Sequence, residues 1–281
     1  MLTAVQEPIV VEKILLAANN LPAFSPASQQ AVKLVNTENV KIPNLAAAIS
    51  ADQTLTIDLL RIVNSSAFGL PRQITKVQEA ISYAGLDQTR RLIYAATARR
   101  MFGQRQSREM WQHSITSAFV AEGLAFFADS YLDPYDAYLA GLTHDVGKTL
   151  LRTRFSKEYA AMISSMPPNE PWRLLEAERV TFSLDHAQVG AVMMEKWNLA
   201  SDLCAAVKNH HNPAQPDQAL CQVLAIANQI AHQYDTPKEH RVFDHHVLSS
   251  IHLRKDDADN MLFYAQHKID DFLSKIAGSL F

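Results

Sequence analysis

The residues best suited to chemistry in this chain are histidines on the apolar faces of its predicted helices. Residues 143–148 read Thr-His-Asp-Val-Gly-Lys, which places His144 beside Asp145 at the end of an apolar helical stretch. Imidazole and carboxylate groups are good ligands for zinc, iron, manganese and nickel, whereas a thiolate-preferring ion would need cysteine. The doublet therefore predicts part of a site for a divalent transition metal.

Further histidines occupy the inward positions of neighbouring predicted helices: His113, His186, His210 and His211. Burying several imidazoles without partners costs roughly 2 kcal/mol or more for each ring. A shared metal would satisfy them together. For His113 alone, an ordinary core or boundary position is the better interpretation, but the set as a whole predicts metal ligands.

Lys148 follows His144 by about one helical turn and could face the same pocket. Its ammonium would there hold a phosphate or a carboxylate. An ordinary exposed lysine at a helix end is an equally good interpretation. The other histidines lie in polar or charged segments, and we expect them at the surface: His232, His240, His245, His246, His252 and His267.

The composition favours an all-α protein. The chain has 281 residues, 48% of them hydrophobic, only 8 glycines, and apolar residues that recur mostly at helical spacing. Two cysteines without CxxC spacing, Cys204 and Cys221, predict reduced thiols that are buried or half-buried. Without a signal peptide or an apolar run of membrane-spanning length, we expect a cytoplasmic protein that contacts no membrane.

A net charge of −3 gives no support for nucleic-acid binding. Two arginine pairs, 90–91 and 99–100, lie nine residues apart on one predicted helix and could form a local basic face. A solvated helix surface is the better interpretation, so we expect no nucleic-acid partner.

Capping residues mark the starts of several predicted helices, and the helix after Asp133 is one that must position a histidine, His144. Ser25 before Pro26, Asp52 before Gln53, and Asp133 before Pro134 each predict a helix start. Polarity rises around residues 103–108 and suggests a soft boundary. The predicted parts are a lead-in with a short helix (1–20), a helical lobe (21–105), a histidine-bearing lobe (106–235) and a C-terminal extension (236–281).

Several of these stretches resemble known families. Residues 144–148 match the HDxGK signature of the HD superfamily of metal-dependent phosphohydrolases, and the later histidine motifs fit its HD-GYP branch: 111–114, 185–190 and 210–211. Upstream stretches look like the HDOD family, the HD-related output domains: 21–22, 49–55, 63–71 and 77–86. The combined resemblance covers roughly residues 20 to 235 and is more specific than any single motif.

The resemblance implies an all-α fold of two packed helical lobes, of which the second is an HD-like bundle. It also implies a set of metal ligands for one or two ions: His113, His144, Asp145, His186, His210 and His211. Glu109, one turn before His113, and Asn228 could be additional ligands. For Glu109, an exposed position at a helix start is the commoner case. Lys148 would neutralise the phosphate of a bound ligand.

The chain departs from the hydrolytic branch at two positions. Asn228 stands where that branch has an aspartate in its last core helix, and a neutral oxygen donor binds a dication less strongly. Residues 212–216, Asn-Pro-Ala-Gln-Pro, lack the Glu and the Gly-Tyr-Pro of the HD-GYP substrate loop. Recognition of cyclic di-GMP is therefore not expected.

Two functions remain open. The first is a bacterial signal-transduction module that retains a divalent metal (Fe, Zn, Mn or Ni) and acts by binding a signalling protein or a small ligand. We recognise no receiver or sensor domain in this sequence and therefore expect the sensor to be a separate protein. The alternative is a metal-dependent phosphohydrolase acting on a nucleotide or another phosphate ester.

Overall fold

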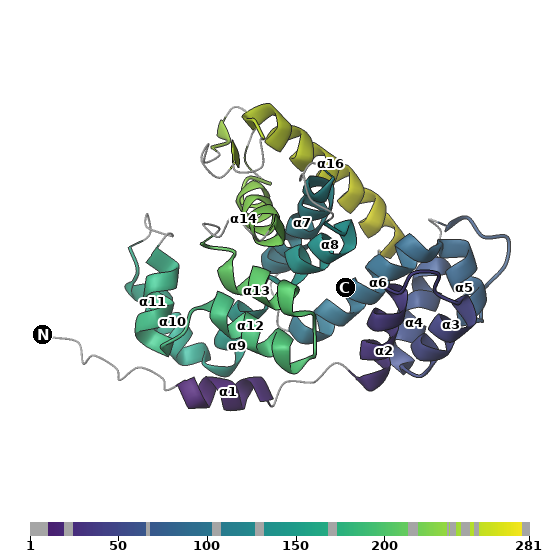
Figure 1. The fold of residues 1–281 in the computed structure, drawn as a ribbon, viewed down its shortest axis with the longest axis horizontal. Coiled ribbons are helices and arrows are strands. Elements are labelled where there is room, and N and C mark those ends of the chain that lie inside the picture. The colour runs from purple at the N-terminus through teal and green to yellow at the C-terminus, as the bar shows by residue number, and fades with distance from the viewer. Residues whose placement is uncertain are drawn as a thin grey trace, which may run out of the picture. The chain divides into compact units, whose positions relative to one another are not determined.

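The computed structural model of the chain is built from helices (Figure 1). It describes residues 11–19, 25–65, 68–102, 108–126, 132–167, 173–212, 219–234, 236, 240–242, 248–249 and 253–276. No strand occurs in these ranges, so the all-α prediction is confirmed. None of the helices there has an apolar stretch that could span a lipid bilayer.

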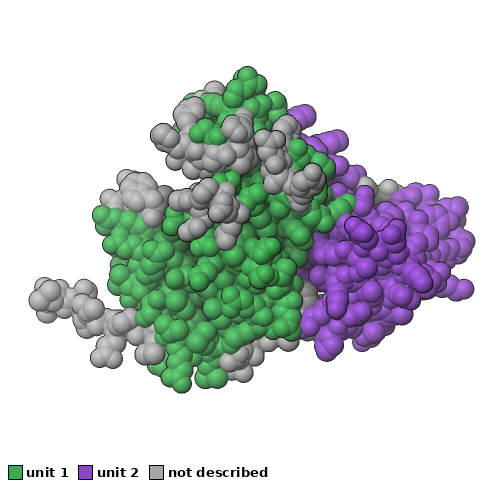
Figure 2. Space-filling model, in the orientation of Figure 1, with its two compact units in different colours: residues 1–21, 105–262 green, residues 22–104, 263–281 purple. Residues whose placement is uncertain are grey.

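The chain divides into two compact units, which Figure 2 shows in different colours. Unit 1 comprises residues 1–21 and 105–262, and unit 2 comprises residues 22–104 and 263–281.

Unit 1 carries every histidine of the predicted ligand set. Its helices are α1 (Val11–Asn19), α7 (Arg108–Ala125), α8 (Pro134–Thr143), α9 (Val146–Arg154), α10 (Ser156–Ser165), α11 (Leu174–Phe182), α12 (His186–Lys196), α13 (Ser201–Asn209), α14 (Ala219–Ala231) and the first part of α16 (Lys255–Ile276). Helix α7 packs on α8 and α14, and α12 packs on α9 and α13. These contacts bring together the ends of helices that lie far apart in the sequence.

Two glycines allow close helix contacts in unit 1. A Cβ atom at Gly141 of α8 would lie 2.5 Å from the Ser117 carbonyl oxygen of α7. A Cβ atom at Gly147 of α9 would lie 2.0 Å from the His186 carbonyl oxygen of α12. Neither position can accept a side chain without moving backbone, so both glycines set how closely the ligand-bearing helices approach.

Unit 2 contains helices α2 (Pro26–Val35), α3 (Ile42–Ser50), α4 (Gln53–Val63), α5 (Val77–Ala84) and α6 (Leu86–Phe102). Asp52 caps α4 as predicted, because its carboxylate accepts hydrogen bonds from the backbone N–H groups of Thr54 and Leu55. Its second oxygen accepts from the Ser25 and Ser28 hydroxyls at the start of α2. One buried aspartate thus ties two helix starts together.

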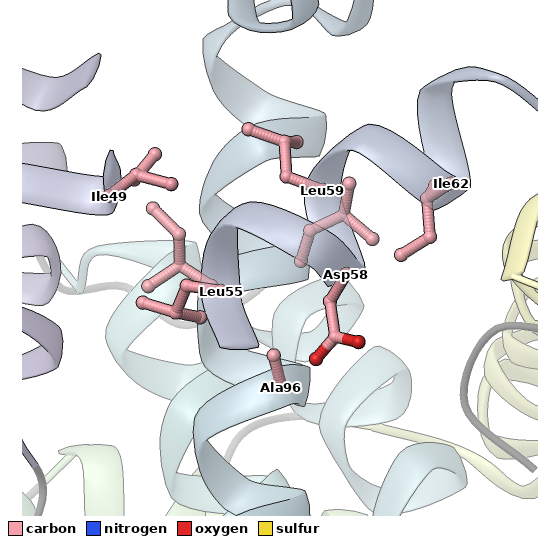
Figure 3. Close-up of a pocket in the computed structure, with 8 residues that line it drawn as sticks. Ile49, Leu55, Asp58, Leu59, Ile62 and Ala96 are labelled. Atoms are coloured by element: carbon pink, nitrogen blue, oxygen red, sulfur yellow. The ribbon is translucent and has the colours of Figure 1, made fainter. Parts of the chain in front are cut away.

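A small cavity of about 10 Å³ lies beside α4 in unit 2. Figure 3 shows Asp58 as the only charged side chain among the labelled residues, which are otherwise apolar. That volume holds about one water molecule and excludes a phosphate-sized ligand.

The predictions for two other helix starts and for the two cysteines are also confirmed. Ser25 caps α2 by accepting from the Ser28 N–H, and Asp133 caps α8 by accepting from the Tyr135 N–H. Cys204 and Cys221 are free and buried, and burial raises the pKa of each thiol to about 11. Arg90 of α6 donates to the Val35 carbonyl at the end of α2, so it has a structural partner inside unit 2.

Candidate metal centre

The predicted ligands come from helix ends and helix faces that converge in unit 1. His144 follows α8 directly, and Asp145 precedes α9. His186 is the first residue of α12, and His210 and His211 follow α13. His113 projects from α7. Because most of these side chains sit at helix ends, small backbone rotations there can aim them at a common point.

The first group of ligand atoms contains His113, His144 and Asp145, whose donor atoms all lie within 4.8 Å of one another. The His113 and His144 Nε2 atoms are 3.2 Å apart. Asp145 Oδ2 lies 3.5 Å from His144 Nε2 and 3.8 Å from His113 Nε2. Ligands at about 2.1 Å from a tetrahedral metal stand roughly 3.4 Å apart, so these separations suit one ion.

The second group contains His186, His210 and His211, again within 4.8 Å of one another. The Nε2 atoms of His186 and His211 are 2.9 Å apart. Asp145 connects the two groups, because its Oδ1 lies 3.4 Å from His186 Nε2 while its Oδ2 faces His144. One carboxylate therefore lies between two sets of imidazoles, an arrangement that suits one ion or a bridged pair.

In three histidines, a hydrogen bond to Nδ1 holds the ring so that Nε2 faces the site. His144 Nδ1 lies 2.8 Å from the Gly141 carbonyl oxygen, and His210 Nδ1 lies 2.6 Å from that of Val207. His186 Nδ1 lies 2.7 Å from a Glu178 carboxylate oxygen. Since carbonyl and carboxylate oxygens only accept, each Nδ1 carries a proton, so in the neutral ring Nε2 is the nitrogen with the lone pair. Metal-binding histidines are held in this way.

Two buried atoms of the cluster have no hydrogen-bond partner: Asp145 Oδ1 and His210 Nε2. His144, Asp145, His186 and His210 are at most 4% exposed, so water does not compensate them freely. Buried polar atoms are normally satisfied, and leaving one unpaired costs about 1–3 kcal/mol. A cation bound by these atoms would remove that cost, so the residues present fit a metal.

The charges of the cluster also suit a cation. Burial lowers the pKa of His113, His144 and His210, so their rings are neutral at pH 7. Burial alone would raise the pKa of Asp145, but His144 and Lys148 outweigh it and hold that pKa well below its usual range. The centre thus offers neutral imidazoles and one ionised carboxylate, which is the protonation state that metal binding requires.

These pKa directions predict an acid-sensitive metal-free protein. In the folded chain the buried rings of His113, His144 and His210 stay neutral, whereas in the unfolded chain they take up protons below pH 6.5. The free energy of unfolding is therefore highest above pH 6.5 and falls as the pH drops, by at most about 1.4 kcal/mol per pH unit for each histidine. Urea unfolding in EDTA at pH 7.5, 6.0 and 5.0 measures this slope. A His210→Gln variant should show a shallower slope, and equal slopes would contradict the prediction.

Lys148 lies beside the predicted ligands and already has a partner there. Its Nζ is 2.8 Å from Asp145 Oδ2, and its side chain is 15% exposed. In this arrangement the ammonium neutralises the one carboxylate of the cluster. The predicted contact of Lys148 with a phosphate stays a prediction.

The two additional ligand candidates behave differently. Asn228 of α14 is buried, and its Oδ1 lies 3.0 Å from His113 Nε2, so it faces the first group. Glu109 is exposed in the first turn of α7 and belongs to neither group of ligand atoms among the described residues. The structure thus brings Asn228 to the centre and leaves Glu109 outside it.

Two residues near the centre, His232 and Glu178, were not predicted from the sequence. His232, expected as an ordinary surface residue, is exposed, but its ring lies 4.4 Å from that of His113. Its position four residues after Asn228, on the same helical face, is the signal that could have indicated this. No such spacing indicated Glu178, which accepts a hydrogen bond from His186, because a turn separates the two residues.

The predicted surface positions of His245, His246 and His252 lie outside the described residues.

The chain is similar to several solved structures at 20–23% sequence identity, which supports the fold alone. An HDOD domain protein of unknown function from Geobacter sulfurreducens is 23% identical, with a TM-score of 0.70 over 97% of this chain and 99% of that one. A proposed phosphohydrolase from Shewanella amazonensis SB2B is 20% identical, with a TM-score of 0.68 over 95% and 98%. A proposed signal transduction protein from Marinobacter aquaeolei VT8 is 20% identical, with a TM-score of 0.73 over 99% and 63%.

A curated but uncharacterised protein of Treponema pallidum (strain Nichols) is 24% identical over 248 residues, which are 85% of this chain. The chain spans about half the length of that relative, 47%. The HDOD domain pattern matches residues 21–213, a range that ends before the predicted end of the second lobe but contains all five predicted histidine ligands. Because this match covers more than half of the 281 residues, the chain belongs to the HDOD family.

Proposed function

We propose that this chain is a signal-transduction module of the HDOD family that holds a divalent transition metal and acts by binding a signalling protein or a small phosphate-containing ligand. The observation that supports the metal most strongly is the convergence of lone pairs. Three rings are held through Nδ1 with Nε2 directed inward, beside a buried Asp145 oxygen that lacks a partner. Such a set is costly without a cation and favourable with one.

The donor types suit iron, zinc, manganese or nickel. Two groups of ligand atoms that share one carboxylate would accept one or two ions. When bound, the metal supplies a Lewis acid at the junction of α7, α8, α12 and α13. The histidines would hold the ion, and Asp145 would balance part of its charge.

Binding without hydrolysis is the favoured mode because the centre contains a single carboxylate. Asn228 occupies the remaining oxygen-donor position beside His113 and brings no negative charge. A pair of dications held by five neutral imidazoles and one carboxylate keeps a large net positive charge, which favours holding an anion over releasing a phosphate product. The same charge would attract a phosphorylated ligand to this face of unit 1.

Phosphate-ester hydrolysis is the second candidate. It is favoured by one specific feature, the placement of Asp145 between the two histidine groups, since a carboxylate shared by two ions is a common part of hydrolytic metal sites. Lys148, 2.8 Å from Asp145, would then contact the phosphate. In this candidate the metal-loaded protein turns over a phosphate ester.

One assay separates the two functions. Protein loaded in turn with Mn²⁺, Fe²⁺, Zn²⁺ and Ni²⁺ is incubated with bis-(p-nitrophenyl) phosphate, p-nitrophenyl phosphate and cyclic di-GMP, beside a His144→Ala, Asp145→Ala double variant. We expect wild type and double variant to release product equally slowly. Turnover that is present in the wild type and lost in the double variant would overturn the binding role and establish the hydrolase.

The Asn228→Asp variant is expected to bind metal more tightly than the wild type. The new carboxylate would lie 3.0 Å from His113 Nε2 and add a second negative charge to the first group. An increase in affinity of about tenfold corresponds to 1.4 kcal/mol, a modest gain for one charge–charge contact. Competition of Zn²⁺ against a chelating dye measures it, and weaker binding in the variant would contradict the prediction.

A further inference from the structure

The carboxylate of Glu178 lies directly behind His186. Glu178 belongs to α11 and is 0% exposed. Its Oε2 accepts a hydrogen bond from the backbone N–H of His186 at 2.8 Å and another from the Nδ1 of the same residue at 2.7 Å. Both the position of the first residue of α12 and the direction of its ring thus depend on one carboxylate oxygen.

A fully buried glutamate is costly unless its charge is compensated. Among the ion pairs of the described residues, Glu178 pairs with His186 alone. Tyr159 of α10 lies near Glu178. Burial raises the pKa of the Tyr159 phenol, and the negative charge of Glu178 raises it further. A neutral imidazole compensates a buried carboxylate poorly, whereas an imidazole that binds a cation through its other nitrogen compensates it well.

The two histidine groups differ in how they obtain negative charge. The first group includes the carboxylate of Asp145, while the second, made of His186, His210 and His211, contains only imidazoles. His210 is held by a neutral carbonyl, that of Val207. Within the second group, His186 is the ring whose hydrogen-bond partner is a carboxylate.

We propose that Glu178 is a positioning residue that orients His186 and increases its donor strength toward a metal held by His186, His210 and His211. The proposal rests on the proposed metal centre and adds to it the residue that supplies charge to the all-histidine group. A carboxylate behind a metal-binding histidine typically contributes 10–100-fold to metal affinity.

The Glu178→Gln variant of the full chain tests this, because it keeps the shape of the side chain and removes its charge. Co²⁺ alone is the probe, followed by calorimetry and by its visible absorption. We expect one class of Co²⁺ sites to weaken by 10–100-fold, with a changed absorption spectrum, while other Co²⁺ binding is kept. Glu122→Gln is the matched control, because Glu122 is also a buried glutamate and lies nine residues, about 13 Å, beyond His113 on α7. It should bind Co²⁺ like the wild type.

Unchanged Co²⁺ affinity and spectrum in a folded Glu178→Gln variant would overturn the role of Glu178 and leave the metal centre standing. No Co²⁺ binding by the wild type would overturn the metal centre itself and this proposal with it. If the glutamine variant does not fold, the same titration of Glu178→Asp decides. Withdrawing the carboxylate by one methylene breaks its contact with Nδ1, so wild-type affinity there would also overturn the proposal.

Discussion

Replacing Asp145 by asparagine is expected to weaken metal binding at both histidine groups at once, by at least about 100-fold, or 2.7 kcal/mol. Asp145 is the one carboxylate in the two groups of ligand atoms, and it faces both groups, with Oδ2 toward His144 and Oδ1 toward His186. The asparagine keeps the shape of the side chain but removes the negative charge that a dication needs. Competition of Zn²⁺ against a chelating dye measures the affinity.

The matched control is Asp133→Asn. Asp133 is an exposed aspartate that caps α8, the helix that ends beside His144. Its replacement changes the charge of the chain by the same amount and should leave Zn²⁺ affinity unchanged. His211→Ala, which removes a ligand of the second group alone, should weaken one class of site. Equal Zn²⁺ affinity in Asp145→Asn and wild type would show that the histidines do not form the site proposed here.

The second large effect is expected from Gly147→Ala, which should destabilise the protein by about 3 kcal/mol or more. A glycine-to-alanine change inside a helix normally stabilises by up to about 1 kcal/mol. Here the new Cβ would meet the His186 carbonyl oxygen at 2.0 Å and the Gly190 backbone nitrogen at 2.7 Å. Because both are backbone atoms, α9 and α12 must separate, which also shifts His186.

Gly190→Ala provides the comparison, since Gly190 lies in the same contact between α9 and α12. A Cβ at Gly190 would have its nearest neighbours at 3.4 Å, including the Val146 and Val207 side chains. These can adjust, so we expect a change within about 1 kcal/mol. Chemical denaturation of both variants in EDTA gives the two free energies of unfolding. Equal effects would contradict the steric explanation.

Much of the fold could be predicted because local chemistry determines it. The caps at Ser25, Asp52 and Asp133 use short-range hydrogen bonds that follow from residue type and spacing, and all three are present. Helical periodicity likewise placed His144, His186 and His210 on buried faces, and these side chains are at most 2% exposed. Family membership could be predicted because the motifs are contiguous in the sequence.

The remaining features depend on tertiary packing, which spacing does not reveal. Glu178 reaches His186 across the turn between α11 and α12, and its helix position alone resembles that of many surface glutamates. The ion pair of Lys148 with Asp145 depends on rotamers, so a free lysine was an equally good expectation. Glu109 shows the opposite case, because correct helical spacing before His113 did not bring it to the centre.

The central claim is that the two histidine groups hold a transition metal. Anomalous X-ray diffraction, measured above and below the absorption edge of the metal found by elemental analysis of the purified protein, tests it most directly. We predict one or two anomalous peaks within bonding distance of Asp145 and the inward Nε2 atoms of His144, His186 and His210. A protein without stoichiometric metal after growth and purification in metal-replete medium, or a peak elsewhere in the chain, would contradict the claim.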